Sequence, residues 1–119
     1  LKSINDRHGH LFGAYVIGEV GRLIGRTLDG SGIAARFGGD EFVAAVPGLD
    51  LEGTRELAER IRATVEDHPF EHEGIVLAPG ISIGIASFPQ SGQSATALFQ
   101  CADAALYRAK HAGKGRVCD

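Results

Sequence analysis

The sequence predicts an α/β (α+β) domain in which helices flank an antiparallel sheet. Three observations lead to this fold class. Apolar residues recur at three- and four-residue steps in three long segments, which is the periodicity of helices buried on one face. Short segments rich in apolar residues lie between them and are bounded by turn-forming residues, as strands are. A chain of 119 residues with 44% hydrophobic residues also has the size and composition of one globular domain.

The first half of the chain predicts a helix followed by a β-hairpin. Residues 1–10 are mostly polar, and we expect a loop that leads into a helix at 12–28. Gly18, Gly21 and Gly25 inside this helix lower its intrinsic stability relative to alanine, and they indicate close packing against a sheet. Two short apolar segments follow at 33–37 and 42–46, and the glycines between them predict a tight turn.

The second half predicts two more helices and further strands. The helix at 49–67 has Thr54 as its expected N-cap, because a hydroxyl there can accept a hydrogen bond from the first turn. The other expected elements are an extended stretch at 75–77, a strand at 81–87, a helix at 94–111 and a strand at 116–118. On the last helix, Phe99 is expected on the inward face.

The order of these elements predicts the topology. With one further strand in front, it contains the β-α-β-β-α-β unit of ferredoxin-like folds. We therefore expect a first strand ahead of Leu1 that is missing from the sequence. Residues 1–119 are interpreted as a single domain that is incomplete at its N-terminus.

Charge and cysteine content exclude several classes of protein. Twelve basic residues against fifteen acidic ones give a net charge of −3, whereas a nucleic-acid-binding module is basic, so we expect no nucleic-acid partner. Apolar runs are too short to span a bilayer, and we expect no membrane contact by this domain. Two cysteines, Cys101 and Cys118, do not make a disulfide framework, which favours a cytoplasmic protein.

The hairpin turn holds the residues with the clearest chemistry. Gly38 and Gly39 let the backbone approach a ligand closely, and backbone N–H groups in such a turn can face phosphate oxygens. Asp40 and Glu41 follow at once, and carboxylate oxygens beside a phosphate are the ligands that Mg²⁺ prefers. The alternative is an ordinary glycine-rich hairpin whose two acids are only solvated.

Residues 36–42, which read R-F-G-G-D-E-F, resemble the signature of GGDEF domains, the diguanylate cyclase family, in all five signature positions. Other stretches resemble this family in the expected order along the whole chain: K-S-I-N-D and G-H near the start, S-I-G-I at 82–85, A-D-A-A-L-Y-R-A-K at 102–110 and G-K-G-R-V at 113–117.

This resemblance implies a fold similar to the palm of nucleotidyl cyclases. The implied activity is Mg²⁺-dependent (or Mn²⁺-dependent) condensation of two GTP molecules into cyclic di-GMP and pyrophosphate. The reaction would take place between two domains that face each other, so a homodimer is the implied catalytic form. An upstream sensory or receiver domain is the implied source of regulation.

The resemblance also implies roles for individual residues. Asp40 and Glu41 are the implied catalytic metal ligands, and Gly38 and Gly39 would line the phosphates. Asn5 would hydrogen-bond the guanine. The terminal phosphates would contact Lys110 and Lys114, each as a compact positive charge.

Two departures from the family pattern keep other functions open. The expected strand ahead of Leu1 carries a further metal-binding Asp in the family. In the stretch G-H-L-F-G-A, Ala14 stands where the family has an Asp that reads the guanine. One alternative is therefore a catalytically silent domain that binds GTP or acts as a scaffold or regulatory module. Another is a cyclase with relaxed specificity that makes cyclic GMP-AMP.

Overall fold

The computed structural model describes residues 9–119, in which the predicted helices and strands follow one another in the predicted order, with one further strand at Phe70–His72. The three helices of this part are α2 (His10–Leu28), α3 (Leu51–Asp67) and α4 (Ala95–His111). The strands are β1 (Ile33–Gly38), β2 (Glu41–Ala45), β3 (Phe70–His72), β4 (Ile75–Leu77), β5 (Ile83–Gly84) and β6 (Val117–Cys118). The expected loop at 1–10 lies almost wholly outside the described residues.

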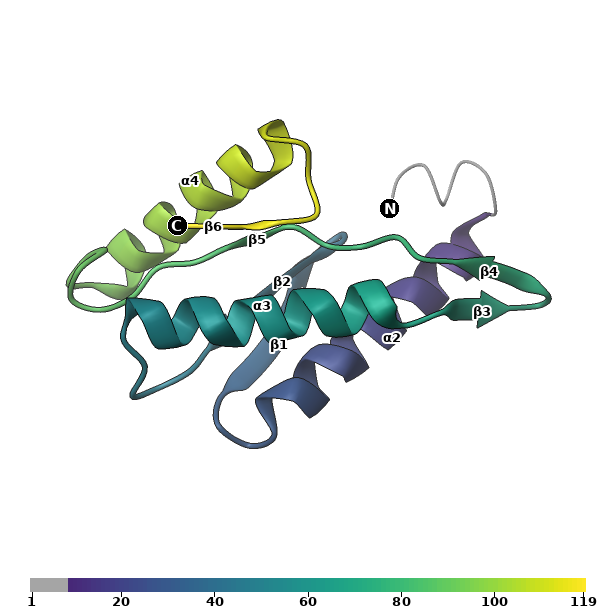
Figure 1. Ribbon diagram of the computed structural model, residues 1–119, viewed down its shortest axis with the longest axis horizontal. Helices are drawn as coiled ribbons and strands as arrows, with labels where there is room; N and C mark the ends of the chain where they lie inside the picture. The colour runs from purple at the N-terminus through teal and green to yellow at the C-terminus, as the bar shows by residue number, and fades with distance from the viewer. Residues whose placement is uncertain (1–8) are drawn as a thin grey trace.

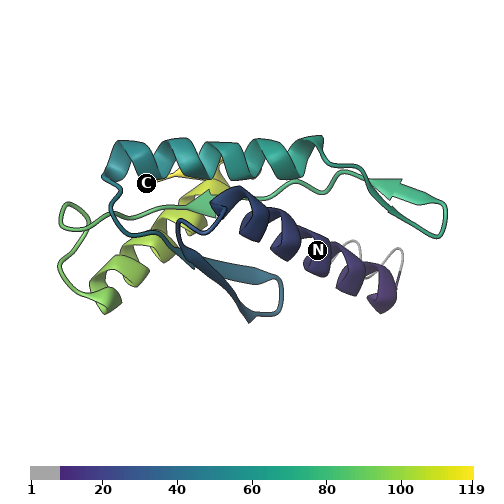
Figure 2. The same ribbon diagram turned by 90° about the horizontal axis from the view of Figure 1, so that it is seen from below.

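The described strands pair two by two (Figure 1). The β1–β2 and β3–β4 pairs are antiparallel hairpins, whereas β5 and β6 are parallel. The last pair differs from the predicted antiparallel sheet because α4 connects its two strands, and a crossover helix returns the chain in the same direction. The mixed α/β class is confirmed, with helices beside the strands in both views (Figure 2).

The core lies where α2, α3 and β3 meet. Leu23 of α2, Val65 of α3 and Phe70 of β3 are its largest fully buried side chains. The buried cluster is completed by Phe12, Val16, Val20, Ile24, Leu28, Leu57 and Ile61. These residues are the apolar faces that the helical periodicity predicts, so burial of amphipathic helices holds this part of the domain together.

The contact between α4 and β5 is closer than an ordinary side-chain contact. Ala105 and Ala109 of α4 are fully buried. A Cβ placed on Gly84 of β5 would lie 2.1 Å from the Ala102 carbonyl oxygen and 2.3 Å from the Leu106 nitrogen. Only a glycine at this position lets the helix backbone lie directly on the strand.

The ends of the helices correct one prediction. Asp50 caps α3, and its carboxylate accepts a hydrogen bond from the Gly53 N–H at 2.7 Å. Thr54 is therefore not the N-cap; it lies in the first turn, where its hydroxyl donates to the Asp50 carbonyl. Ser94 caps α4 in the same way through the Ala97 N–H.

Three further expectations differ from the structure. The sequence pattern does not predict strand β3, and Glu73 and Gly74, both at positive φ, turn the chain from it into β4. The strand expected at 81–87 is limited to Ile83–Gly84, because its partner β6 is equally short. Phe99 is 41% exposed instead of facing inward, and its ring packs against that of Phe37 with centroids 5.2 Å apart.

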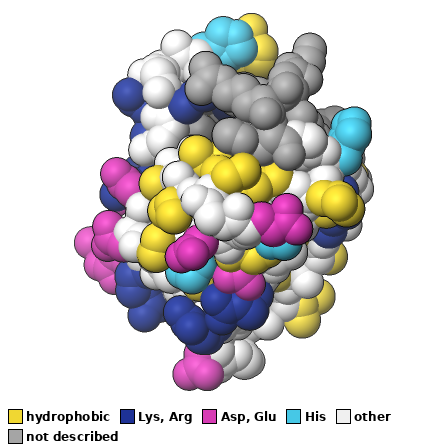
Figure 3. Space-filling model, turned by 90° about the vertical axis from the view of Figure 1, so that its right-hand side faces the viewer, with side chains coloured by type: hydrophobic (Ala, Val, Ile, Leu, Met, Phe, Trp, Pro, Cys, Tyr) yellow, Lys and Arg dark blue, Asp and Glu magenta, His cyan; other side chains and the backbone are white. Residues whose placement is uncertain are grey.

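The end of the molecule drawn in Figure 3 carries side chains of both charges. Figure 3 shows acidic, basic and histidine side chains interspersed among apolar ones on one end of the molecule. Among residues 9–119, no helix is both long and apolar enough to cross a bilayer.

Candidate functional site

The turn between β1 and β2 has a backbone that favours glycine at two successive positions. Gly38 has φ 155° and Gly39 has φ 51°, and a Cβ at either position would meet no atom within 4 Å. The strand register shifts between Arg36 and Gly38, which leaves Phe37 as an extra residue in a bulge. The sequence thus correctly predicts a glycine turn, and the open space around it leaves its backbone accessible to a ligand.

Asp40 and Glu41 lie at the end of this turn, and both are exposed. Their proximity follows from their adjacency in the sequence. Among residues 9–119, no group of three or more histidine, cysteine or acidic side chains is placed to hold a metal ion. This part of the chain therefore offers two carboxylates at the turn and no complete protein cage.

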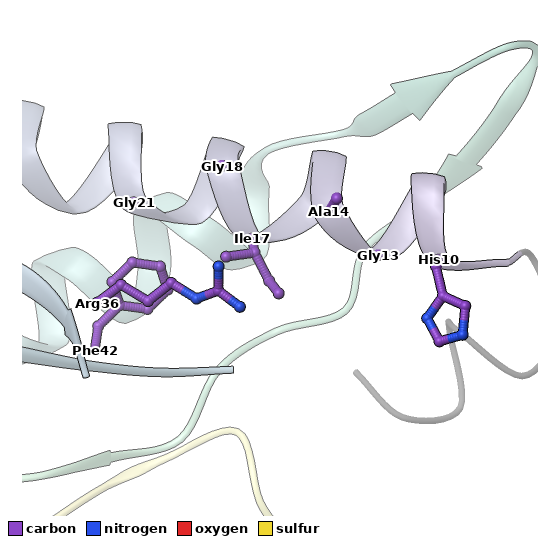
Figure 4. Close-up of a pocket in the computed structure, with 8 residues that line it drawn as sticks. All are labelled: His10, Gly13, Ala14, Ile17, Gly18, Gly21, Arg36 and Phe42. Carbon is purple, nitrogen blue, oxygen red and sulfur yellow. The ribbon is translucent and has the colours of Figure 1, made fainter. Parts of the chain in front are cut away.

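A cavity of about 440 Å³ lies between α2 and the β1–β2 hairpin (Figure 4). It is lined by His10, Gly13, Ala14, Ile17, Gly18 and Gly21 from α2, and by Arg36 and Phe42 from the hairpin. Most of this lining is small or apolar, and Arg36 and His10 supply its polar side chains. The volume and the flat, apolar lining suit a ring system with a few polar atoms.

The small residues of α2 account for the shape of the cavity. Gly21 packs under the Phe42 ring, since a Cβ there would lie 3.1 Å from its Cε1 atom. Gly18 and Gly25 have no such neighbour within 4 Å. The prediction that the helix glycines allow close packing is therefore correct for Gly21 alone, whereas Gly18 leaves open space in the cavity wall.

Arg36 joins the cavity to the signature turn. Its Nε and Nη2 atoms donate hydrogen bonds to the Gly39 carbonyl oxygen, at 2.9 Å and 2.6 Å. The same side chain lines the cavity, and Figure 4 shows its guanidinium extending alongside Ile17. The Arg36 side chain thus links two neighbouring features. One is the cavity, which suits a ring system, and the other is the turn, which suits phosphates.

The two lysines that the family resemblance assigns to substrate lie near the C-terminal end of the chain. Lys110 is exposed in the last turn of α4. Lys114 follows at φ 62°, and its N–H donates to the Ala109 carbonyl at 3.0 Å. Within the described part of the chain, no hydrogen bond or ion pair joins either lysine to the residues of the turn. Asn5 lies outside the described residues.

The sequence alone does not assign Arg36, His10 or Phe42 to the site. Arg36 belongs to the signature stretch, but its partner is a backbone carbonyl, which no residue pattern reveals. His10 has a structural place at the start of the helix, yet it also lines the cavity. A usable signal is the recurrence of Ala14, Gly18 and Gly21 at four- and three-residue steps, which marks a face of α2 with little side-chain bulk.

Comparison with known proteins gives a consistent assignment. The model of the family described as "Diguanylate cyclase, GGDEF domain" matches residues 1–116. Diguanylate cyclase DgcP of Pseudomonas aeruginosa is 41% identical over 117 residues, which cover 98% of this chain and 17% of that protein. The chain spans 17–33% of the length of three curated relatives, each 36–41% identical to it.

Solved structures share the fold. The GGDEF domain of YfiN from Pseudomonas aeruginosa matches with a TM-score of 0.91 and 32% identity, covering 99% of this chain and 75% of that one. The GGDEF domain of DgcB from Caulobacter crescentus, solved in complex with c-di-GMP, matches with a TM-score of 0.90 and 33% identity. That match covers 98% of this chain and 70% of the other.

Proposed function

The chain belongs to the GGDEF family of diguanylate cyclase domains, and on this premise we propose that it condenses two GTP molecules into cyclic di-GMP. In each half of the reaction, the 3′-hydroxyl oxygen of one GTP forms a bond to the α-phosphorus of the other. The bond from that phosphorus to the oxygen that bridges it to the β-phosphate breaks, pyrophosphate leaves, and the hydroxyl proton is released to solvent. The observation that carries the proposal is the exposed turn 38–41 beside a cavity large enough for a base.

In this proposal the cavity takes the guanine, and the turn faces the phosphates. Gly38 and Gly39 leave their backbone open, so N–H groups at the turn can donate to phosphate oxygens. Asn5 is assigned to the guanine edge. Lys110 and Lys114 are assigned to the terminal phosphates, since both are exposed cations at the end of α4.

Asp40 and Glu41 are the proposed ligands of Mg²⁺ (or Mn²⁺). The donor set fits such an ion, because two exposed carboxylates supply the hard oxygens it prefers. Mg²⁺ commonly keeps several waters and uses only one or two carboxylates together with substrate phosphates, so a complete protein cage is not needed. When bound, the ion would act as a Lewis acid that offsets charge on the phosphate oxygens.

The catalytic form is proposed to be a homodimer, controlled by an upstream sensory or receiver domain in the whole protein. Within the described residues, one turn and one neighbouring cavity serve one nucleotide, whereas the product contains two. A second copy of the domain, facing the first, supplies the other nucleotide and the same set of residues.

Replacing Asp40 by Asn tests the proposal. The change removes one negative charge from an exposed turn, so the fold should be unaffected while turnover falls about a hundredfold or more. The measurement is formation of cyclic di-GMP and pyrophosphate from GTP with MgCl₂, together with a thermal melt of each protein.

Asp103→Asn is the matched control, because Asp103 is exposed on α4 and does not line the cavity. It should retain the activity of the parent. If Asp40→Asn keeps full activity, the metal-ligand assignment is wrong. If the parent itself binds GTP but yields no product, the domain is a silent nucleotide-binding module.

A further inference from the structure

The side chain of Arg36 makes an unusual pair of contacts in the site. Two of its nitrogens, Nε and Nη2, donate to one acceptor, the carbonyl oxygen of Gly39. This forked geometry requires a planar guanidinium, and a lysine ammonium cannot reproduce it. The contact spans the bulge at Phe37, so it bridges the irregular part of the hairpin.

The contact between Arg36 and the Gly39 carbonyl orients the whole peptide unit and not the oxygen atom alone. The Gly39 carbonyl and the Asp40 N–H belong to the same planar peptide unit, so holding one also orients the other. Gly39 has φ 51° and follows Gly38 at φ 155°, and glycine backbones have many other conformations available to them. Arg36 therefore restricts the backbone that leads directly to the Asp40 carboxylate.

The same guanidinium also has donors left for the cavity. A guanidinium carries five N–H groups, and two are directed to Gly39. Arg36 lines the cavity next to Ile17 and Phe42, so its remaining N–H groups lie at the boundary between cavity and turn (Figure 4). One residue thus connects the wall of the cavity to the peptide before Asp40.

We propose that Arg36 is a positioning residue, which holds the Gly39–Asp40 peptide so that Asp40 is presented in one orientation to the metal-bound substrate. This inference rests on the proposed cyclase function for its kinetic consequence. Its structural part, the restraint of the turn, stands without that function.

The structural part is tested by ¹⁵N relaxation of the whole 119-residue chain. In Arg36→Lys, the positive charge remains but the fork is lost, so the ¹⁵N order parameters of the Gly39 and Asp40 amides should fall below those of the parent. Arg60→Lys is the control, because Arg60 is exposed on α3 and does not line the cavity. Unchanged order parameters in Arg36→Lys, or an equal fall at the turn in Arg60→Lys, would overturn the inference.

The kinetic part separates positioning from substrate binding. If Arg36 positions Asp40, Arg36→Lys should lower kcat about tenfold. It should also raise the Mg²⁺ concentration needed for the half-maximal rate, while KM for GTP changes little. In an Asp40→Asn background, Arg36→Lys should have no further effect, because the group that it orients is gone. A rise in KM alone would make Arg36 a simple binding residue and would contradict the proposal. If the parent makes no cyclic dinucleotide, the proposed function fails, while the relaxation experiment still decides whether Arg36 restrains the turn.

Discussion

Ala14 is the residue on which we expect base choice to depend in the proposed cyclase. It lines the cavity proposed for the guanine, and its methyl group can neither accept nor donate a hydrogen bond. Guanine presents two N–H donors on its Watson–Crick edge, and a carboxylate can accept from both. A site with such a bond rejects analogues that lack the donors, whereas an apolar wall rejects them weakly.

We therefore expect Ala14→Asp to raise the preference for GTP over ATP by at least about tenfold. Competition between the two nucleotides, with products resolved by mass, gives the ratio of cyclic di-GMP to mixed cyclic GMP-AMP. Ala104→Asp, which adds the same charge on an exposed position of α4, should leave the ratio unchanged. A parent that already excludes ATP as strongly as Ala14→Asp would show that another group reads the base.

The sequence predicts the site residues that adjoin one another in the chain. It does not predict the site residues that come together only through folding. Residues 38–41 form one turn because they are neighbours in the chain, so the geometry of the turn follows from local backbone preferences. Arg36 acts on a carbonyl three residues away, and His10 reaches the cavity only because α2 begins there. The roles of both depend on packing that the sequence pattern does not encode.

At the scale of elements, the contact between α4 and β5 is the most sensitive to substitution. Gly84→Ala would place a methyl carbon about 2 Å from backbone atoms of α4, and a backbone cannot move aside as a flexible side chain can. We expect a loss of about 3 kcal/mol or more in the free energy of unfolding. Urea denaturation measures this loss.

Gly25→Ala is the corresponding control within a helix. Gly25 lies inside α2, and a methyl group there would meet no neighbour within 4 Å, so alanine should stabilise the protein by up to about 1 kcal/mol. Similar unfolding midpoints for the two variants would mean that α4 does not rest directly on β5.

The contact between α2 and the C-cap of α3 predicts a pH dependence of stability. Glu19 accepts hydrogen bonds from Arg22 at 3.1 Å and lies 3.2 Å from His68 Nε2. Hydrogen bonding from Arg22, followed by smaller contributions from its charge and from His68, lowers the pKa of Glu19 below its ordinary value of 4.5. The ionised carboxylate therefore stabilises the folded state above that ordinary value. This stabilisation is lost as the pH falls through the lowered pKa.

Glu19→Gln should accordingly be less stable than the parent near neutral pH and equally stable in acid, below the lowered pKa. The difference should also shrink in high salt, since the Glu19–Arg22 pair is partly exposed. Urea midpoints across a pH series test this. Glu56→Gln, which removes a carboxylate at an exposed position of α3, is the matched control. A Glu19→Gln difference that is constant across the series would contradict the expected linkage.

Helices and strands could be predicted from the sequence where their pattern of apolar residues extends over many residues. The helices span several turns, and their apolar faces identify them within about two residues at each end. Strand β3 contains three residues, two of them charged or polar, and it forms because Phe70 is buried against the core. Such a strand depends on a tertiary contact rather than on local propensity.

For the whole molecule, the need for two nucleotides predicts that activity depends on protein concentration. If two domains must meet to place both GTP molecules, turnover per domain should rise with concentration until dimers dominate. A dilution series with constant GTP and MgCl₂ measures this, and fusion to a dimeric coiled coil should abolish the dependence. Turnover that is flat across the series without a fusion would argue against a catalytic homodimer.

The close contact at Gly84 also affects how related proteins are detected. The stretch S-I-G-I contains this glycine, and its identity is fixed by the Ala102 carbonyl oxygen rather than by any reacting group. A descendant that has lost Asp40 still needs Gly84 to keep α4 in place. We therefore expect this stretch to mark the architecture and not the activity, whereas the turn at 38–41 holds the proposed metal ligands.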